Sequence, residues 1–148
     1  MHALVSDEEQ FGAVVIGIDF TVVATLKLPP GSWVVFATVA LAADSDALGT
    51  ATVQMRFQLD GNPYGTAVQS DFTITNQVSG IIGGFRVVPL TTGLVLDTEK
   101  TLQVACAATQ KNTVSSQPTT ITAVQVESVT RIPTEHPGEF VSPKDAHL

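Results

Sequence analysis

The chain of 148 residues lacks the cysteines of a disulfide framework and the long apolar runs of membrane-spanning helices. Cys106 is its only cysteine, which excludes an internal disulfide framework. No apolar run reaches the ~20 residues that a membrane-spanning helix requires. Charged residues make up only 14% of the chain, well below the typical proportion of about a quarter. A surface with so few charges is suited to burial between subunits.

Groups that commonly carry catalysis are also missing from the predicted fold. The three histidines, His2, His136 and His147, all lie in the terminal segments, so a histidine base or a multi-histidine metal site inside the fold is excluded. No Ser-His-Asp arrangement, P-loop or dinucleotide-binding glycine motif occurs. Asp71 and Glu127 are the isolated strand carboxylates, and each alternates outward rather than into a cleft. We therefore expect no enzymatic activity and no cofactor.

The turn sequence at Asp60–Gly65 carries one weak metal-binding pattern. Asp60 and Asn62 have the D-x-N spacing of calcium loops, but the remaining ligands and the closing glutamate are missing. A turn held by hydrogen bonds from side chains to the backbone explains the same residues. The sequence therefore predicts a turn and no metal site.

The net charge of −7 narrows the classes of partner. No basic patch is present to neutralise phosphates, which argues against direct binding of nucleic acid. The N-terminus has neither the basic region nor the apolar core of an export signal. We expect a protein made in the cytoplasm that does not bind membranes.

The most informative stretch runs from Pro29 to Ala42. A Pro-Pro-Gly turn leads into a strand that is apolar on both alternating faces, with only Thr38 polar. One face holds Trp33, Val35, Ala37, Val39 and Leu41, and the other holds Val34, Phe36, Ala40 and Ala42. A half-buried strand alternates apolar and polar residues, so the second face of this strand needs a cover. In a chain of this size we expect that cover to be another copy of the protein.

Other segments show the same two-residue period, and helical periodicity is almost absent. Strands are predicted at 20–28, 32–42, 53–59, 68–74, 85–90, 94–96, 102–108 and 119–130, with 11–18 as a possible leading strand. Pro89 places its strand at an edge or a bulge, and 110–118 is predicted to be a polar loop. The pattern predicts an all-β protein of about 8–9 strands, an antiparallel sandwich or jelly roll with extended N- and C-terminal segments. The predicted divisions are 1–18 (first segment), 19–131 (jelly roll) and 132–148 (C-terminal arm).

Three segments stand out by their order along the chain: residues 28–35 (LPPGSWVV), 102–106 (LQVAC) and 121–126 (ITAVQV). They resemble the trimeric jelly-roll family of tumour necrosis factor and the complement-type globular heads, in its compact bacterial and phage versions, and the resemblance implies a jelly-roll β-sandwich. The first segment is similar to the family's turn into the central inner strand, the second to its penultimate strand and the third to its closing strand. Bacterial relatives often carry a second cysteine in the strand occupied here by 53–59. This chain has none, so we expect Cys106 to be a small buried core residue.

The resemblance implies a homotrimer about a three-fold axis, with inner-sheet aromatic residues packed at that axis. Trp33 and Phe36 lie on opposite faces of their strand, so one can fill the core while the other faces a neighbouring subunit. The candidates for the trimer interface or core are Trp33, Val34, Phe36, Thr38, Phe85, Val124 and Val126.

Two functions are open at this point. The first is a non-enzymatic structural protein, a homotrimer that decorates a larger protein lattice such as a phage capsid and is located in the virion. It would attach through a terminal segment, with Phe11, Arg131, Ile132, Pro133 and Phe140 as the attachment candidates. The alternative is a secreted or cell-surface trimer that recognises carbohydrate or a receptor protein through the loops at 44–49, 60–65 and 110–117. The proline-containing tail is either disordered or an extended arm along a neighbour, and we expect the arm.

Overall fold

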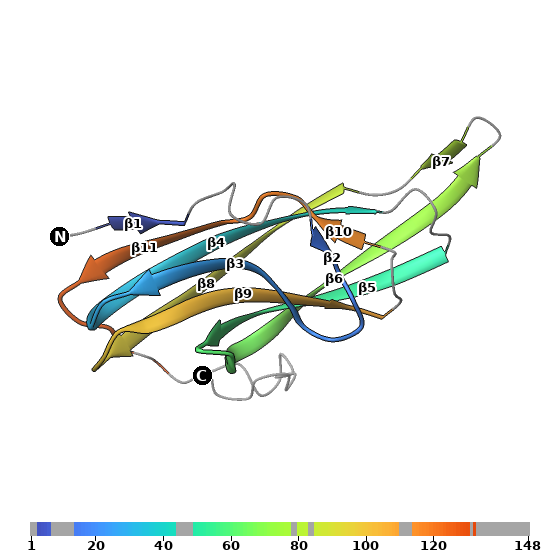
Figure 1. Cartoon of the computed structure of the whole chain (residues 1–148). Coiled ribbons are helices and arrows are strands. Elements are labelled where there is room, and N and C mark those ends of the chain that lie inside the picture. Colours follow the sequence, from blue (N-terminus) through green and yellow to red (C-terminus); the bar gives the residue numbers. More distant parts are fainter. Residues whose placement is uncertain are drawn as a thin grey trace, which may run out of the picture.

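A computed structural model of the chain describes residues 3–6, 14–43, 49–77, 80–82, 85–109, 114–130 and 132. The described part is built of strands, which form two antiparallel sheets packed face to face (Figure 1). This confirms the predicted all-β sandwich.

The first sheet, called sheet A here, contains six of the described strands. Its order is β1 (Ala3–Val5), β11 (Thr120–Val126), β4 (Gly31–Ala43), β10 (Val114–Ser116) and β2 (Val14–Val15), and β8 (Phe85–Leu96) pairs with the other edge of β4. Sheet B has the order β3 (Thr21–Leu28), β9 (Lys100–Ala108), β5 (Gly49–Leu59), β6 (Asn62–Gln77) and β7 (Gly80–Ile82).

The strand order is that of a jelly roll. Successive connections carry the chain back and forth between the sheets, so that β1, β11, β4 and β8 form one layer while β3, β9, β5 and β6 form the other. The short strands β2, β7 and β10 extend these layers. The eight strands of the two layers agree with the predicted number.

The core lies between the sheets and is filled by alternate residues of the long strands. In β4 the inward residues Trp33, Val35 and Leu41 are at most 1% exposed, as their spacing predicts. Sheet B faces them with Met55 from β5 and Leu102, Val104 and Cys106 from β9. Burial of Cys106 confirms its predicted place in the core. The Trp33 indole is held in position because its N–H donates a hydrogen bond of 3.0 Å to the Pro29 carbonyl.

Two predictions about sheet A need correction. Residues 85–90 and 94–96 form one continuous strand, β8, rather than two. Pro89 is tolerated because β8 pairs with β4 on one side and is otherwise an edge strand in the described sheet, as the proline predicts. Part of the predicted loop 110–118 is also a strand, since β10 continues the line of β11 along β4. Pro118 separates the two because it cannot donate a ladder hydrogen bond.

At the N-terminal end, the predicted strand 11–18 is only partly found. Within its described residues the strand is limited to β2, and residues 11–13 lie outside the described ranges. The strand β1 was not predicted. Ser6 fixes β1 at the sheet edge, since its N–H donates to Ile121 O and its Oγ accepts from Ile121 N, both at 2.8 Å.

The predicted turn at 60–65 is shorter than expected. Asp60 and Gly61 alone connect β5 to β6, with φ angles of 48° and 84° that fit a type I′ hairpin. Asp60 Oδ1 accepts a hydrogen bond of 2.9 Å from Thr101 N, and Asp60 Oδ2 lies 3.5 Å from Lys100 Nζ. The carboxylate therefore holds the turn against β9, as the turn interpretation predicts.

Candidate interaction surface

The side of sheet A that faces away from the core is the most unusual surface of the protein. Alternation places the even-numbered residues of β4 on it, because the odd-numbered ones fill the core. Phe36 lies near the middle of this side, between Thr122 of β11 and Thr91 of β8 in the strand register. We call the outward residues of β1, β2, β4, β8, β10 and β11 the sheet-A face.

Large apolar side chains are concentrated on the sheet-A face. Five of them are about half exposed: Val5 at 59%, Val15 at 53%, Phe36 at 48%, Val87 at 55% and Val95 at 63%. Singly exposed apolar residues are normal on a monomer, but several on one face indicate an interaction site. The solvated side of an antiparallel sheet is ordinarily polar. The sheet-A face thus has the character of a surface made to be covered.

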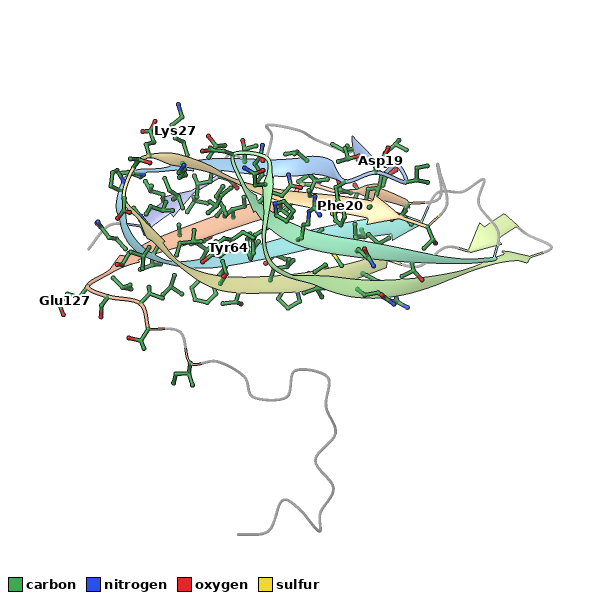
Figure 2. All side chains as sticks on the ribbon, turned by 90° about the horizontal axis from the view of Figure 1, so that it is seen from below. Asp19, Phe20, Lys27, Tyr64 and Glu127 are labelled. Carbon is green, nitrogen blue, oxygen red and sulfur yellow. The ribbon has the colours of Figure 1, made fainter. Side chains whose placement is uncertain are left out.

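Charge is absent from the outward positions that the structure describes on this face. The charged residues of the described part lie in sheet B or in connecting segments, apart from Arg86 of β8. Arg86 is opposite Leu41, whose side chain points into the core. The Arg86 side chain therefore lies on the inward side of sheet A and not on the sheet-A face. Figure 2 shows Lys27 and Glu127 toward one end of the sandwich and Asp19 toward the other. The described part of the face therefore presents no charge to an approaching molecule.

The outer side of sheet B has a different character. The Arg56 guanidinium stacks on the Phe20 ring, 3.6 Å from its centroid, and donates to Gln58 Oε1 at 2.8 and 3.0 Å. Gln58 Nε2 is 3.4 Å from Gln103 Oε1, which extends the polar network from β5 to the neighbouring strand β9. Ala105 of β9 is opposite Arg56 in the register and is fully buried beneath these polar side chains. The outer side of sheet B is therefore covered by polar side chains of the same chain, whereas apolar side chains stay exposed on the sheet-A face.

The structure separates the interface and core candidates into two groups. Trp33 fills the core at 1% exposure and does not reach the sheet-A face. The outward positions of β4 and β11 hold the candidates Val34, Phe36, Thr38, Val124 and Val126. Phe85 pairs with Ala42 through the backbone, and its side chain lies outside the described part.

Among the attachment candidates the structure describes Ile132, which is 87% exposed. The other four, Phe11, Arg131, Pro133 and Phe140, lie outside the described residues, as does most of the predicted arm.

Four of the exposed apolar residues on the sheet-A face were not among the candidates: Val5, Val15, Val87 and Val95. Two of these residues, Val87 and Val95, could have been found from the sequence. They alternate with Leu90, Leu94 and Leu96, which are buried. This is the same pattern, apolar on both faces, that marks residues 33–42.

The rest of the described molecule offers little reactive chemistry. Burial raises the pKa of the Cys106 thiol to about 12, so this thiol stays protonated at neutral pH. Within the described ranges no group of three or more His, Cys, Asp or Glu side chains is arranged to hold a metal ion. Likewise, no helix in the described ranges is long and apolar enough to cross a bilayer.

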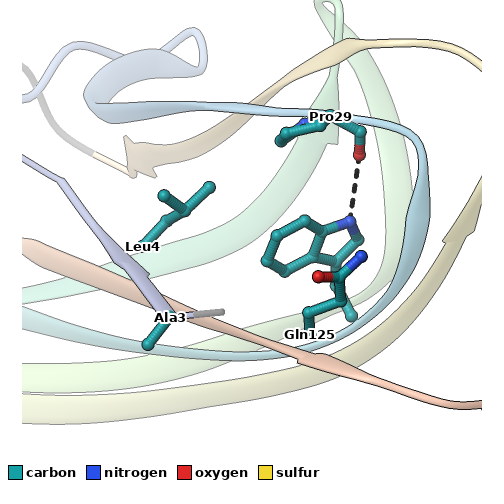
Figure 3. Close-up of a pocket in the computed structure, with 5 residues that line it drawn as sticks. Ala3, Leu4, Pro29 and Gln125 are labelled. Atoms are coloured by element: carbon teal, nitrogen blue, oxygen red, sulfur yellow. Dashed lines mark hydrogen bonds between the residues drawn. The ribbon is translucent and has the colours of Figure 1, made fainter. Parts of the chain in front are cut away.

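A cavity of about 410 Å³ lies between β1 and the turn that joins β3 to β4 (Figure 3). Its lining is formed by Ala3, Leu4, Pro29, Trp33 and Gln125. Leu4, Trp33 and Gln125 point to the core side of sheet A, whereas Ala3 is opposite the outward Val124, so the cavity lies at the edge of the sheet-A face.

Comparisons with known proteins show the fold alone. No family model matches the chain, and no curated protein matches it. Among solved structures, dimeric latent PorU from Porphyromonas gingivalis is similar over 84% of this chain, with a TM-score of 0.51 and 13% sequence identity. The similar region is 12% of that longer chain. The chain is therefore similar in its β-sandwich to one part of a much larger protein.

Proposed function

We propose that the protein is a non-enzymatic structural protein, a homotrimeric jelly roll that decorates or stabilises a larger assembly such as a phage capsid. The strongest support for this proposal comes from the sheet-A face. It carries five half-exposed apolar side chains, and its described outward positions hold no charged residue. In this proposal copies of the chain cover one another through that face.

A neutral apolar face is suited to meeting its own copy. Burial of apolar surface contributes roughly 25 cal/mol per Å². Like-charge contacts, which would oppose self-association, do not arise between surfaces without charge. Phe36 is the natural anchor, since large aromatic side chains near the centre of an interface carry much of the binding energy.

Attachment to a lattice would use a terminal segment. Ile132, at 87% exposure, begins the proposed attachment segment just beyond the sandwich. One such contact per subunit is weak, but three contacts from one trimer act together and raise the overall affinity. This explains how a small chain with so few charges could hold to a shell.

The mass of the purified protein in solution tests self-association. We expect light scattering to give three times the chain mass for the wild type and a monomer mass for Phe36→Glu, because the substitution would bury an unpaired charge in the interface. Ile18→Glu is the matched control, since Ile18 is 58% exposed but lies outside sheet A. A monomeric wild-type protein would contradict the proposal.

Capsid decoration is tested separately. The full-length trimer should bind purified phage particles, or the shell protein encoded beside it, and deletion of residues 132–148 should abolish binding while the trimer mass persists. Full binding by the truncated trimer would exclude the C-terminal segment, and a substitution of Phe11, the N-terminal attachment candidate, would be tested next. A trimer that binds no shell in either form would contradict decoration but not self-association.

A further inference from the structure

We infer that the cavity between β1 and the β3–β4 turn is a binding site for a small neutral amphiphile, a molecule with an apolar chain or ring and one hydroxyl or amide group. The cavity volume of about 410 Å³ falls within the range of small-molecule sites. Figure 3 shows Leu4 of β1, Pro29 of the β3–β4 turn and Gln125 of β11 around the cavity, with the side chain of Ala3 pointing away from them. The inference does not rest on the proposed function, because three of the lining residues lie on the other side of sheet A from Phe36.

Most of the lining is apolar. Ala3 and Leu4 come from β1, Pro29 comes from the turn, and Trp33, only 1% exposed, lines the cavity with a small part of its ring. Leu4 is partly buried against the core, which makes the cavity an opening at the sandwich edge rather than a feature of a loop. An apolar chain or ring would gain contacts here that water cannot provide.

The polar part of the site comes from one residue. The Trp33 indole N–H is already used, since it donates to Pro29 O at 3.0 Å. Gln125 is opposite Trp33 in the register of β11 and β4, so its side chain points to the same side of the sheet as the indole. Of the five lining residues, Gln125 therefore contributes the polar group that a ligand can reach, a carboxamide that both donates and accepts.

Gly31 makes room for that carboxamide. It adopts a φ of 144°, and a Cβ at this position would lie only 2.9 Å from Gln125 Nε2. A side chain here would push the amide out of its place. The backbone is thus arranged so that the amide of Gln125 can lie beside the indole.

The lining also defines the charge of the ligand. None of the five residues is ionisable, so a charged head group would lose its water without gaining a counter-ion. A hydroxyl or amide head can instead replace its water by a hydrogen bond to Gln125. The site should therefore prefer an alcohol to a carboxylate of the same chain length.

Trp33 makes the test direct, because it is the only tryptophan of the chain and its fluorescence reports on the cavity wall. We expect 1-octanol to cause a saturable change in Trp33 emission at pH 7, and octanoate to bind at least about tenfold more weakly. Gln125→Met keeps the side-chain length and removes the amide, and it should weaken octanol binding about three- to tenfold.

Filling the cavity gives a second variant. Leu4→Phe should abolish the octanol response, whereas the matched change Ile18→Phe, at an exposed site away from the cavity, should leave it intact. A wild-type protein without a saturable response would overturn the inference, and so would equal binding of octanol and octanoate. If Leu4→Phe fails to fold, Gln125→Met decides, since unchanged affinity in that variant would overturn the assigned site.

Discussion

Val129 packs so closely on Gly93 that a Cβ at Gly93 would lie 2.6 Å from Val129 Cγ1. Gly93 is opposite Val34 in the register, so this contact is on the outer side of sheet A. The segment after β11 therefore crosses β8 at the one outward position there that has no side chain. Tyr64 lies in β6 of sheet B, and its hydroxyl donates a hydrogen bond of 3.0 Å to Gly93 O. This bond ties β8 to sheet B.

Gly93→Ala should consequently destabilise the protein or displace the segment that contains Val129. We expect a loss of about 1–3 kcal/mol in the free energy of unfolding, the usual cost of overpacking. Denaturant unfolding measures it. Gly17→Ala is the matched control, because the nearest atom to a Cβ there is 3.9 Å away. If both variants were as stable as the wild type, the close contact would have no energetic weight.

Ser6 provides a second test, because it holds the edge strand β1 to β11. Ser6→Ala removes the Oγ that accepts from the buried Ile121 N–H, and an unsatisfied buried donor costs about 1–3 kcal/mol. We expect lower stability and faster hydrogen exchange at the Ile121 amide. Ser128→Ala, at an exposed position, should change neither quantity. Unchanged exchange at Ile121 in Ser6→Ala would show that the contact does not hold β1 in place.

Burial of the Cys106 thiol predicts that the stability of the protein depends on pH in the alkaline range. Burial raises the pKa of its thiol from 9.0 to about 12. As the pH rises above 9 the thiol of the unfolded chain ionises while the folded one stays protonated, so the unfolded state is favoured. Below pH 9 both states are protonated, and the thiol contributes no pH dependence.

We expect the wild type to lose about 1.4 kcal/mol of stability per pH unit above 9, relative to Cys106→Ala measured at the same pH. Measuring both proteins at the same pH cancels the contributions to the pH dependence that they share. Parallel stability curves for the two proteins would show that the thiol is not buried as described.

Alternation predicted the inner and outer faces of the long strands better than their bounds, since β8 was expected as two strands and β6 begins at Asn62, within the expected turn 60–65. Trp33 and Phe36 were placed on opposite faces from spacing alone, and the structure puts the first in the core and the second on the surface. The short strands β1 and β10 were not predicted because their strand conformation depends on pairing with distant segments rather than on their own sequence. β1 has only three residues, and the hydrogen bonds of the adjacent Ser6 hold it to β11. β10 is a strand because it pairs with the C-terminal part of β4, beyond the part of β4 that pairs with β11.

The candidate surface was only partly predictable for a similar reason. Val34 and Phe36 belong to one apolar strand, but Val5, Val15, Val87 and Val95 reach the same face through pairings between distant segments. The cavity was not predictable at all, since it needs Leu4, Pro29 and Gln125 to meet from three separate parts of the chain.

The pairing of β4 has a consequence for synthesis on the ribosome. β5 and β6 can form their hairpin as soon as they emerge, but β4 must wait for β8 at 85–96 and for β11 at 120–126. The sheet-A face is therefore completed only after residues 120–126 have emerged. Nascent chains that have not reached this point would not present a finished adhesive surface to one another.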